Sequence, residues 1–208
     1  MNYREKIMEE FIKQFMQKKC KDIKVDDIAE NLGISKRTIY ENFSSKDEII
    51  KETLSYYQKL NQEKTLKISQ EEENPLRKIL KMAFAFINDT CQIRFERLEN
   101  LRKHYPETAN NLIHSHLQFM KDVMLNAYTQ AQNEGYIFKE IEPEFLLALL
   151  HSSGTAYEHQ TFHILGKDYN MFALFKAHIF TILRGVSTLK GIKVCDEYYS
   201  ETKEILNL

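Results

Sequence analysis

The sequence predicts an all-α protein, on three observations. Apolar residues recur at helical spacing through nearly the whole chain of 208 residues, and no longer segment alternates between apolar and polar positions. Glycine and proline are few, with 6 and 3 occurrences, which disfavours the turn-rich all-β folds. The hydrophobic fraction of 43% and the charged fraction of 28% are typical of a folded globular chain.

Composition also limits the class of function. The formal net charge of −1 excludes overall basicity, so any surface for nucleic acid must be local. The 3 cysteines lie far apart, which argues against a disulfide framework and suits a reducing cytosol. The N-terminus carries charges throughout, unlike a signal peptide, and no uncharged apolar run reaches about 18 residues. We therefore expect a cytoplasmic protein with no membrane partner.

The N-terminal part divides into helices of unequal length. An apolar stripe predicts a first helix over residues 7–16, followed by a polar break at 18–24. A short helix is predicted over 28–32, where Gly33 stops it. A second short helix is predicted over 35–43, with a serine at its first position as the cap.

Capping residues and prolines also mark where later helices begin. Ser45 and Glu48 fit the capping-box pattern and predict the start of a long helix. Asn74 and Pro75 are suited to the N-cap and first position of the next one. Further helices are predicted over residues 76–87, 93–103, 112–133, 142–166 and 170–190. The last of these is expected to end before Gly191, with one short helix possible from Asp196 onward.

Residues 25–46 carry the pattern of a helix-turn-helix unit. Two short helices are joined by a turn that contains Gly33, and Ile28 and Ala29 are expected to face Ile39. The second helix turns side chains outward that suit phosphates and base edges in a major groove. These side chains are Lys36, Arg37, Thr38 and Asn42. Residues 1–50 hold ten basic and ten acidic residues, so the positive field of this face is modest.

These residues resemble the TetR family of bacterial transcriptional regulators. The resemblance rests on Ile28-Ala29, Leu32-Gly33-Ile34-Ser35, Thr38-Ile39-Tyr40, Phe43 and Ser45-Lys46-Asp47-Glu48-Ile49. It covers residues 5–57 in motif detail and continues beyond them as an all-helical layout. One departure is Lys24, which stands where the family often has a threonine or serine that caps the helix and touches phosphate.

The resemblance implies a fold and a function. It implies a three-helix helix-turn-helix DNA-binding domain at residues 1–48, joined by a long helix to a helical effector-binding and dimerisation domain at 49–208. It implies a repressor more than an activator, bound to double-stranded DNA. Tyr40 and Lys46 would contact phosphates, while Lys36, Arg37 and Thr38 would lie near base edges. The candidate DNA-binding set is Lys24, Ser35, Lys36, Arg37, Thr38, Tyr40, Asn42 and Lys46. The alternative for Tyr40 is packing beside Phe43, and for Lys46 a solvated first turn.

A homodimer is expected for two reasons. One small helix-turn-helix reads only a few base pairs, so paired half-sites must supply the missing affinity. The last two long helices are also more apolar than one buried stripe requires, and the family's dimer is a four-helix bundle of these helices. The candidate interface residues are Leu146, Leu150, Phe172, Phe175, Ile179 and Ile182. The small residues 152–156 either permit close helix packing or leave room beside a ligand.

The resemblance also implies a small-molecule effector inside the C-terminal domain, whose binding shifts the helix that begins at Ser45. Candidate lining residues are Phe84, Phe95, Tyr105, Phe119, Tyr128, Tyr157 and Phe162. Such an apolar lining suits a hydrophobic or amphipathic ligand, and ordinary core packing is the alternative for each residue. The sequence does not identify the ligand.

No metal, cofactor or catalytic activity is expected. His159 and His163 lie four residues apart on one helix face and could hold a transition metal, but structural histidines are favoured. The sequence lacks the nucleophile, phosphate-binding, dinucleotide-binding and zinc-protease motifs of common enzymes. The second hypothesis is a helical dimeric adaptor or ligand sensor that has lost operator binding. Its association with DNA would lack salt dependence.

Overall fold

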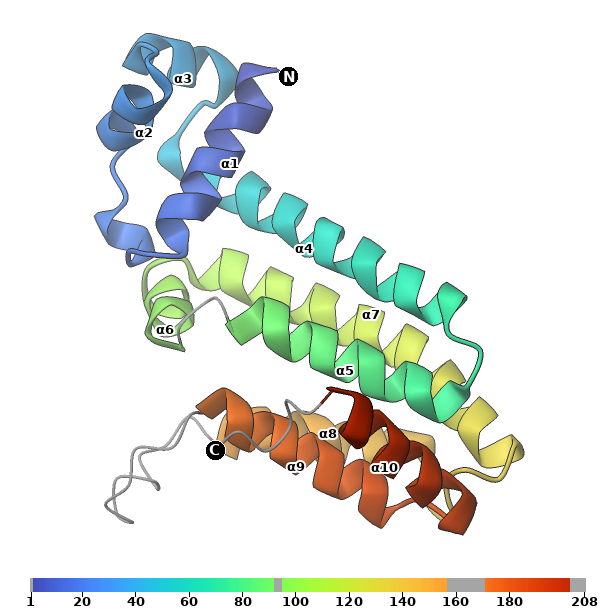
Figure 1. The fold of residues 1–208 in the computed structure, drawn as a ribbon. Coiled ribbons are helices and arrows are strands. Elements are labelled where there is room, and N and C mark those ends of the chain that lie inside the picture. Colours follow the sequence, from blue (N-terminus) through green and yellow to red (C-terminus); the bar gives the residue numbers. More distant parts are fainter. Residues whose placement is uncertain (1, 92–94, 157–170, 203–208) are drawn as a thin grey trace. The chain divides into compact units, whose positions relative to one another are not determined.

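The structure of the chain is a computed structural model, and it describes residues 2–91, 95–156 and 171–202. These residues form helices and one isolated bridge between Ile137 and Ser187, with no strand among them. The predicted all-α fold is therefore confirmed. The elements, in the order of Figure 1, are α1 (Tyr3–Phe15), η1 (Cys20–Asp22), α2 (Val25–Leu32), α3 (Lys36–Asn42), α4 (Lys46–Glu71), α5 (Pro75–Cys91), α6 (Phe95–His104), α7 (Pro106–Asn133), α8 (Pro143–Ala156), α9 (Met171–Gly185) and α10 (Leu189–Thr202).

The chain divides into two compact units. The first comprises Met1–Gln62 and Gln92–Leu117, and the second comprises Glu63–Cys91 and Gln118–Leu208. The long helices α4 and α7 each contribute to both units. The first unit extends past residue 48, because Ile49 and Ile50 are buried in the same core as Ile7.

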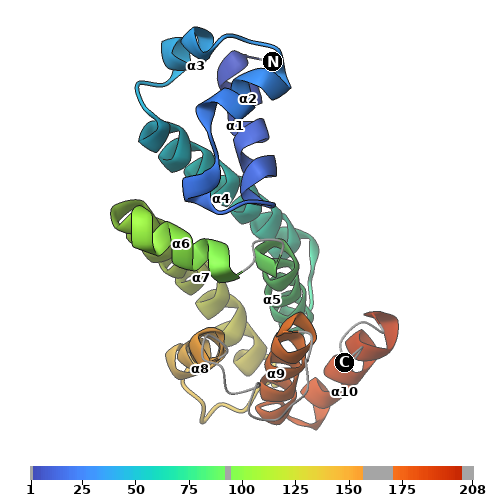
Figure 2. The same cartoon turned by 90° about the vertical axis from the view of Figure 1, so that its left-hand side faces the viewer.

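In the first unit, α1, α2 and α3 pack against one another around an apolar core. Asn2 caps α1 in a capping box with Glu5. Both cartoon views place α3 at one end of this unit and α6 at the other (Figures 1 and 2). The largest fully buried side chains of this core are Ile7, Phe11, Phe15, Ile23, Ile28, Ile39, Phe43, Ile49 and Ile50. Burial of each such side chain contributes about 1.5–3 kcal/mol, so these contacts fix the position of the short helices.

The second unit is built from helices that pack around a separate core. Helix α5 packs against α9 and α10, and α8 packs against α9. The predicted start of α5 is confirmed: the Asn74 side chain accepts hydrogen bonds from the backbone N–H groups of Leu76 and Arg77, and Pro75 is the first helical residue. Residues central to this core include Leu80, Phe84, Met124, Tyr128, Leu146, Ile179 and Leu183.

The predicted last helix was wrong in its C-terminal boundary. Helix α9 ends at Gly185, and Gly191 lies inside α10 rather than after a helix. The Thr188 backbone N–H donates to the Tyr136 carbonyl at 3.0 Å, which holds the turn between the helices. A Cβ at Gly191 would lie 2.1 Å from that same carbonyl oxygen. The glycine therefore permits close approach of α10 to the Tyr136 backbone, and it does not end a helix.

Two other expectations concern the extent of the helix at Pro143 and membrane-spanning helices. The predicted continuation of the helix that begins at Pro143 toward Gly166 lies outside the described residues beyond Ala156. Among the described helices, none combines the length and apolar character needed to cross a membrane.

Candidate nucleic-acid interface

The turn between α2 and α3 is fixed by backbone geometry. Gly33 adopts φ 63° and ψ 32°, in the left-handed region that favours glycine. The N–H of Gly33 donates to the Glu30 carbonyl at 3.1 Å, and the N–H of Ile34 donates to the Ala29 carbonyl at 3.0 Å. These bonds satisfy carbonyls at the end of α2 and set the angle at which α3 begins.

Ser35 begins α3 as predicted. Its hydroxyl accepts a hydrogen bond from the backbone N–H of Thr38 at 3.0 Å, which is the N-cap geometry. The two hydroxyl groups of Ser35 and Thr38 also lie 2.9 Å apart. Both residues therefore stabilise the first turn of α3 in the free chain.

The open face of α3 presents a subset of the predicted side chains. Lys36 and Arg37 are exposed, with 87% of the Arg37 side chain accessible, and Tyr40 is 45% exposed. Asn42 is half-buried, and its amide donates to the Thr38 carbonyl at 2.7 Å. The structure thus brings Lys36, Arg37 and Tyr40 together on one accessible surface, whereas Asn42 is occupied within its own helix.

Both basic side chains of α3 have an acidic neighbour. The Lys36 ammonium lies 2.9 Å from an Asp26 carboxylate oxygen, and the Arg37 Nε lies 3.0 Å from a Glu41 oxygen. The hydrogen bond to Asp26 raises the pKa of Lys36 above its ordinary value. Exposed pairs of this kind contribute about 0–1 kcal/mol, so a phosphate or a guanine can replace the carboxylate at little cost.

The two remaining predicted lysines differ in their surroundings. Lys24 is exposed at the N-cap position of α2, and its side chain makes no capping hydrogen bond. Lys46 is half-buried at the start of α4, and its ammonium donates to the Lys21 carbonyl at 3.2 Å. That bond holds the Lys46 ammonium beside the segment that precedes α2.

The start of α4 departs from the predicted capping box. The Ser45 hydroxyl accepts from the Glu48 N–H at 3.1 Å, as the pattern predicts. The Glu48 carboxylate, however, accepts from the N–H of Ser44 at 2.6 Å and from the Ser44 hydroxyl at 2.5 Å. The return contact therefore reaches one residue further back than the backbone N–H of Ser45. These two bonds lower the pKa of Glu48 to about 2.

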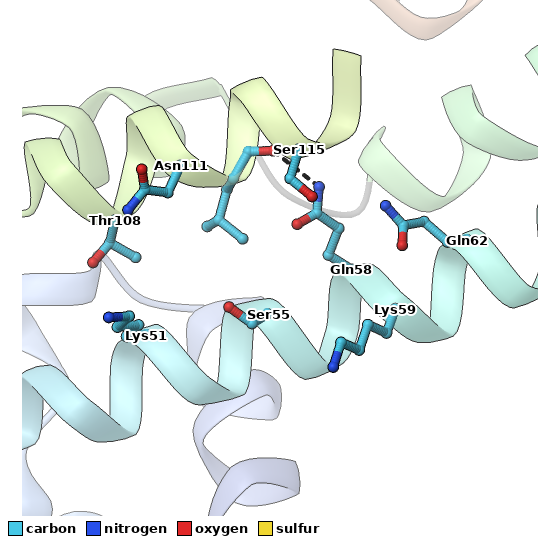
Figure 3. Close-up of a pocket in the computed structure, with 9 residues that line it drawn as sticks. Lys51, Ser55, Gln58, Lys59, Gln62, Thr108, Asn111 and Ser115 are labelled. Atoms are coloured by element: carbon cyan, nitrogen blue, oxygen red, sulfur yellow. Dashed lines mark hydrogen bonds between the residues drawn. The ribbon is translucent and has the colours of Figure 1, made fainter. Parts of the chain in front are cut away.

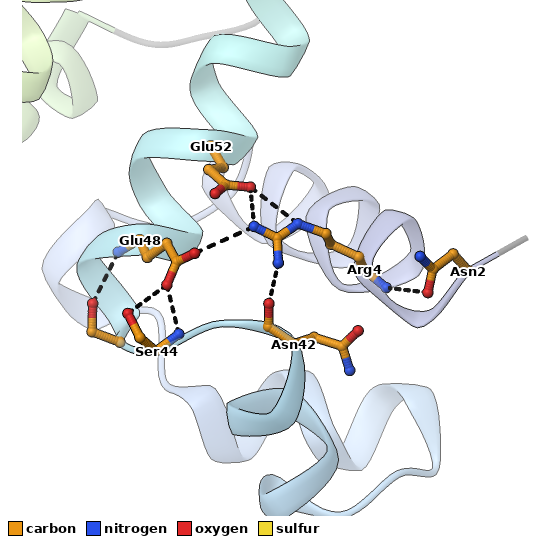
Figure 4. Close-up of polar contacts among 7 residues, drawn as sticks. Asn2, Arg4, Asn42, Ser44, Glu48 and Glu52 are labelled. Carbon is orange, nitrogen blue, oxygen red and sulfur yellow. Dashed lines mark hydrogen bonds and ion pairs between the residues drawn. The ribbon is translucent and has the colours of Figure 1, made fainter.

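Arg4 links three helices and was not anticipated from the sequence. Its guanidinium donates to the carboxylates of Glu52 and Glu48 in α4 and to the backbone carbonyl of Asn42 at the end of α3 (Figure 4). The guanidinium also lies 4.2 Å from the ring centroid of the buried Phe43. Arg4 thereby fixes the C-terminal end of α3 against α1 and α4.

The predicted effector-pocket residues are distributed over two cores. Phe84 and Tyr128 are buried in the core of the second unit, and the half-buried Phe119 packs against it. Tyr105 packs against the core of the first unit. The side chain of Phe95 and the whole of Tyr157 and Phe162 lie outside what the structure describes.

Tyr128 has the most unusual environment of this set. Burial raises its pKa, so its hydroxyl is protonated near neutral pH. Within the described part of the chain, that hydroxyl has no hydrogen-bond partner. A buried hydroxyl without a partner is energetically costly, and a ligand that offers an acceptor would remove that cost.

The predicted dimer residues also divide into two groups. Leu146, Leu150 and Ile179 are buried in the core of the second unit, while Phe175 and Ile182 are half-buried against it. The side chain of Phe172 lies outside the described set. Phe145, in the same apolar run of α8, is 62% exposed. The described structure also contains no cluster of metal-ligating side chains, and His159 and His163 fall outside it.

The helix-turn-helix segment matches a known family. Residues 7–53 match the model of the bacterial regulatory proteins of the tetR family. That range includes α2, α3 and the start of α4, so the resemblance inferred from the sequence is confirmed. No curated protein matches the chain.

Solved structures share the fold over most of the chain. The ketosteroid transcriptional regulator KstR2 of Mycobacterium tuberculosis is 16% identical, with coverage of 90% of this chain and 96% of that chain and a TM-score of 0.60. The fatty acid degradation regulator FadR from Bacillus halodurans is 17% identical, with 88% and 95% coverage and a TM-score of 0.63. A protein from Saccharomonospora viridis, solved in complex with choline, is 14% identical, with 95% coverage of both chains and a TM-score of 0.65.

Proposed function

We propose that this chain, which carries the helix-turn-helix segment of the tetR family, is a transcriptional repressor that binds an inverted-repeat DNA operator as a homodimer. A small, hydrophobic or amphipathic effector releases it from DNA or modulates its binding. The regulator acts in the cytoplasm, where its operator is accessible.

The accessible face of α3 is the observation that carries this proposal. The Gly33 turn, the Ser35 cap and the buried Ile39 hold the backbone of α3, and Lys36, Arg37 and Tyr40 project from it. A guanidinium can donate two hydrogen bonds to guanine, and ammonium and phenol groups donate to phosphates. We assign base reading to Arg37, with Lys36 and Thr38 near base edges. Phosphate contacts fall to Tyr40, Lys46 and Lys24, with Ser35 and Asn42 nearby.

Homodimer formation is supported by the apolar character of α8 and α9. Phe145 is largely exposed, and Phe175 and Ile182 keep part of their surface accessible in the single chain. Isologous packing of such a face would cover it and would present two copies of α3 to paired half-sites. We propose that Leu146, Leu150 and Ile179, which are buried in the core of the second unit, hold α8 and α9 in the position that this face requires.

An effector site in the second unit is supported by the core around Tyr128. Phe84 and Phe119 supply apolar surface there, and the Tyr128 hydroxyl offers one unpaired donor. Apolar lining with one convergent polar group suits an amphipathic ligand. Of the similar structures, one is described as a ketosteroid transcriptional regulator and one as a fatty acid degradation regulator, and the third was solved with choline, which supports a small-molecule effector.

Selection from a random duplex pool tests the proposal. The full chain is incubated with the pool, bound duplexes are sequenced, and a salt titration is run on the enriched sequence. We expect an inverted repeat, and the logarithm of the binding constant should fall linearly with the logarithm of salt concentration.

The adaptor hypothesis predicts the opposite result. It is favoured by one observation: Lys36 and Arg37 are both paired with carboxylates of the chain itself. In that case the folded dimer would enrich no sequence, with or without candidate effectors. Its weak association with DNA would also be independent of salt concentration. These two results together would favour the adaptor hypothesis over the regulator.

A further inference from the structure

A polar groove between α4 and α7 in the first unit has no role in the proposed function. Its volume is about 250 Å³. It is lined by residues between 51 and 62 of α4 and between 108 and 115 of α7 (Figure 3). The lining residues are Lys51, Ser55, Gln58, Lys59, Gln62, Thr108, Asn111, Leu112 and Ser115. The Gln58 amide donates to the Leu112 carbonyl at 2.9 Å, and this bond joins the two helices along the groove.

The charged side chains of the lining are all positive, and its neutral polar side chains can donate or accept hydrogen bonds. Both charged groups that line the groove are ammonium groups, from Lys51 and Lys59, and no carboxylate lines it. Neither lysine forms an ion pair with any residue that the structure describes. Figure 3 shows Lys51 on α4, with Thr108 and Asn111 on α7 at the other wall of the groove. An acceptor-rich anion would satisfy these groups, whereas a second cation would not.

The position of α7 adds to this preference for an anion. Thr108 lies in the first turn of α7, and a helix N-terminus carries a partial positive charge. The volume is below the roughly 300–1,000 Å³ of sites for drug-sized ligands, so a metabolite-sized molecule fits better. Leu112 is the one aliphatic side chain of the lining, which leaves little apolar surface for a hydrophobic ligand.

The geometry points to a binding site for a small hydroxylated anion, bearing a carboxylate or a phosphate, between Lys51 and Lys59 of α4 and Asn111 of α7. The Lys51 ammonium binds the anionic group, and the Lys59 ammonium, which points away from α7 in Figure 3, joins it after a change of side-chain rotamer. The amide and hydroxyl groups of the walls bind the hydroxyls of the ligand. This site is distinct from the Tyr128 region of the second unit, and its ligand class is the opposite of the hydrophobic effector expected there.

Calorimetric titration of the full chain in the absence of DNA tests the site. The probes are inorganic phosphate, citrate and 3-phosphoglycerate, with glycerol as the neutral control. The K51Q/K59Q variant removes both ammonium groups, and K64Q/K67Q makes the same change in charge on exposed positions of the same helix that do not line the groove. N111L removes a wall donor with no change in charge.

We expect at least one anionic probe to bind and to shift amide NMR resonances within residues 51–62 and 108–115. K51Q/K59Q should weaken that binding by about tenfold or more, N111L by about threefold, and K64Q/K67Q by less than about twofold. Equal losses in both double variants would overturn the site, because they would indicate general attraction of anions to α4. Absence of binding by every anionic probe would overturn it as well.

DNA backbone phosphates are the competing partner for these lysines. If K51Q/K59Q leaves anion binding unchanged but flattens the salt dependence of duplex binding, the small-anion site is wrong and the lysines belong to the DNA interface. Since the titrations contain no DNA, failure of the anion site leaves the operator-binding proposal untouched, and failure of operator binding leaves the anion site untouched.

Discussion

Arg4 illustrates how one side chain can set the position of a recognition helix. Its guanidinium joins the Asn42 carbonyl to Glu48 and Glu52, so a group in α1 connects the end of α3 with the start of α4. A cation also interacts favourably with the C-terminal end of a helix, where carbonyl groups lack partners. We therefore expect Arg4 to affect DNA binding through the orientation of α3.

Replacement of Arg4 by methionine should reduce both stability and DNA affinity. Loss of the charge-assisted bonds should lower the free energy of unfolding by about 1–2 kcal/mol. Operator affinity, measured well below the unfolding temperature, should fall by about tenfold because α3 is less well held. Arg4→Lys should recover only part of this loss, since an ammonium cannot span three acceptors in a planar fork. Lys6→Met, an exposed control in α1, should leave both quantities nearly unchanged.

Glu48 should make stability sensitive to acid. Its pKa is about 2 in the folded chain, below the ordinary value of 4.5, because Ser44 donates two hydrogen bonds to the carboxylate. A lowered carboxylate pKa stabilises the folded state above about pH 4.5, and this contribution is lost as the pH falls from 4.5 toward 2. Glu48→Gln should therefore be less stable than wild type at pH 7, with a difference that shrinks below pH 4.5.

Urea unfolding at a series of pH values measures this effect. Glu9→Gln is the matched control, since Glu9 is an exposed carboxylate of α1. A Glu48→Gln difference that stays constant from pH 7 to pH 2.5 would contradict the role of the Ser44 bonds. Loss of structure in either variant at pH 7 is visible in the same curves.

At the scale of the helices, Arg37 of α3 and Lys46 of α4 should make different kinds of DNA contact. Arg37→Ala should reduce affinity for the selected operator by about 1–3 kcal/mol and relax preference at one base position. Lys46→Ala should weaken all duplexes alike and reduce the slope of the salt dependence by about 0.9. Binding titrations on the operator, a point-substituted operator and an unrelated duplex distinguish these patterns. An equal loss on all three duplexes for Arg37→Ala would assign Arg37 to phosphate instead.

Helix α10 depends on a glycine for its packing. Gly191→Ala would place a Cβ 2.1 Å from the Tyr136 carbonyl oxygen, so either backbone segment must move. We expect a loss of about 1–3 kcal/mol in the free energy of unfolding, as for other overpacked sites. Gly185→Ala, where a Cβ meets nothing within 4 Å, should stay within about 0.5 kcal/mol of wild type. Thermal unfolding of both variants measures the two losses in stability. Equal stability of Gly191→Ala and Gly185→Ala would contradict a tight contact at Gly191.

These elements also show what the sequence can and cannot predict. The Ser35 cap, the Gly33 turn and the Asn74-Pro75 start of α5 were predicted correctly, because each depends on residues within five positions of one another. Arg4 was missed because its partners lie 38 to 48 residues away, and a single basic residue in an amphipathic helix carries no local signal. The role of Gly191 was predicted wrongly for the same reason. A glycine after an apolar helical pattern suggests a helix end, whereas here it is required by a tertiary contact with the Tyr136 backbone.

The candidate DNA-binding residues followed the same division. The exposure of Lys36 and Arg37 was predicted from helical spacing, and that of Tyr40 from the family resemblance. Their ion pairs were less visible: Glu41 lies one turn from Arg37, but Asp26 reaches Lys36 from another helix. The polar groove left no signal in either helix alone, because it exists only where α4 and α7 pack together.

At the scale of the whole molecule, operator binding and dimerisation should depend on each other. Each copy of α3 contacts one half-site, and a dimer converts the second contact into an intramolecular event with a high effective concentration. The dimer itself should form through α8 and α9, where Phe145 is 62% exposed. Disruption of that face should therefore reduce operator affinity even though Phe145 contacts no DNA.

Phe145→Glu tests this linkage, because it places a charge at the centre of the expected apolar contact. We expect sedimentation velocity to give a dimer for wild type and a monomer for the variant at micromolar concentration. Affinity for the full inverted repeat should fall by about 100-fold, whereas affinity for a single half-site should change little. Phe138→Glu is the matched control, since Phe138 is 45% exposed and lies outside α8 and α9. If Phe145→Glu remains dimeric, or Phe138→Glu dissociates the dimer equally, the partner face lies elsewhere. A wild-type chain that is monomeric and still prefers the inverted repeat would contradict the linkage itself. Two independent monomers gain no affinity from a second half-site.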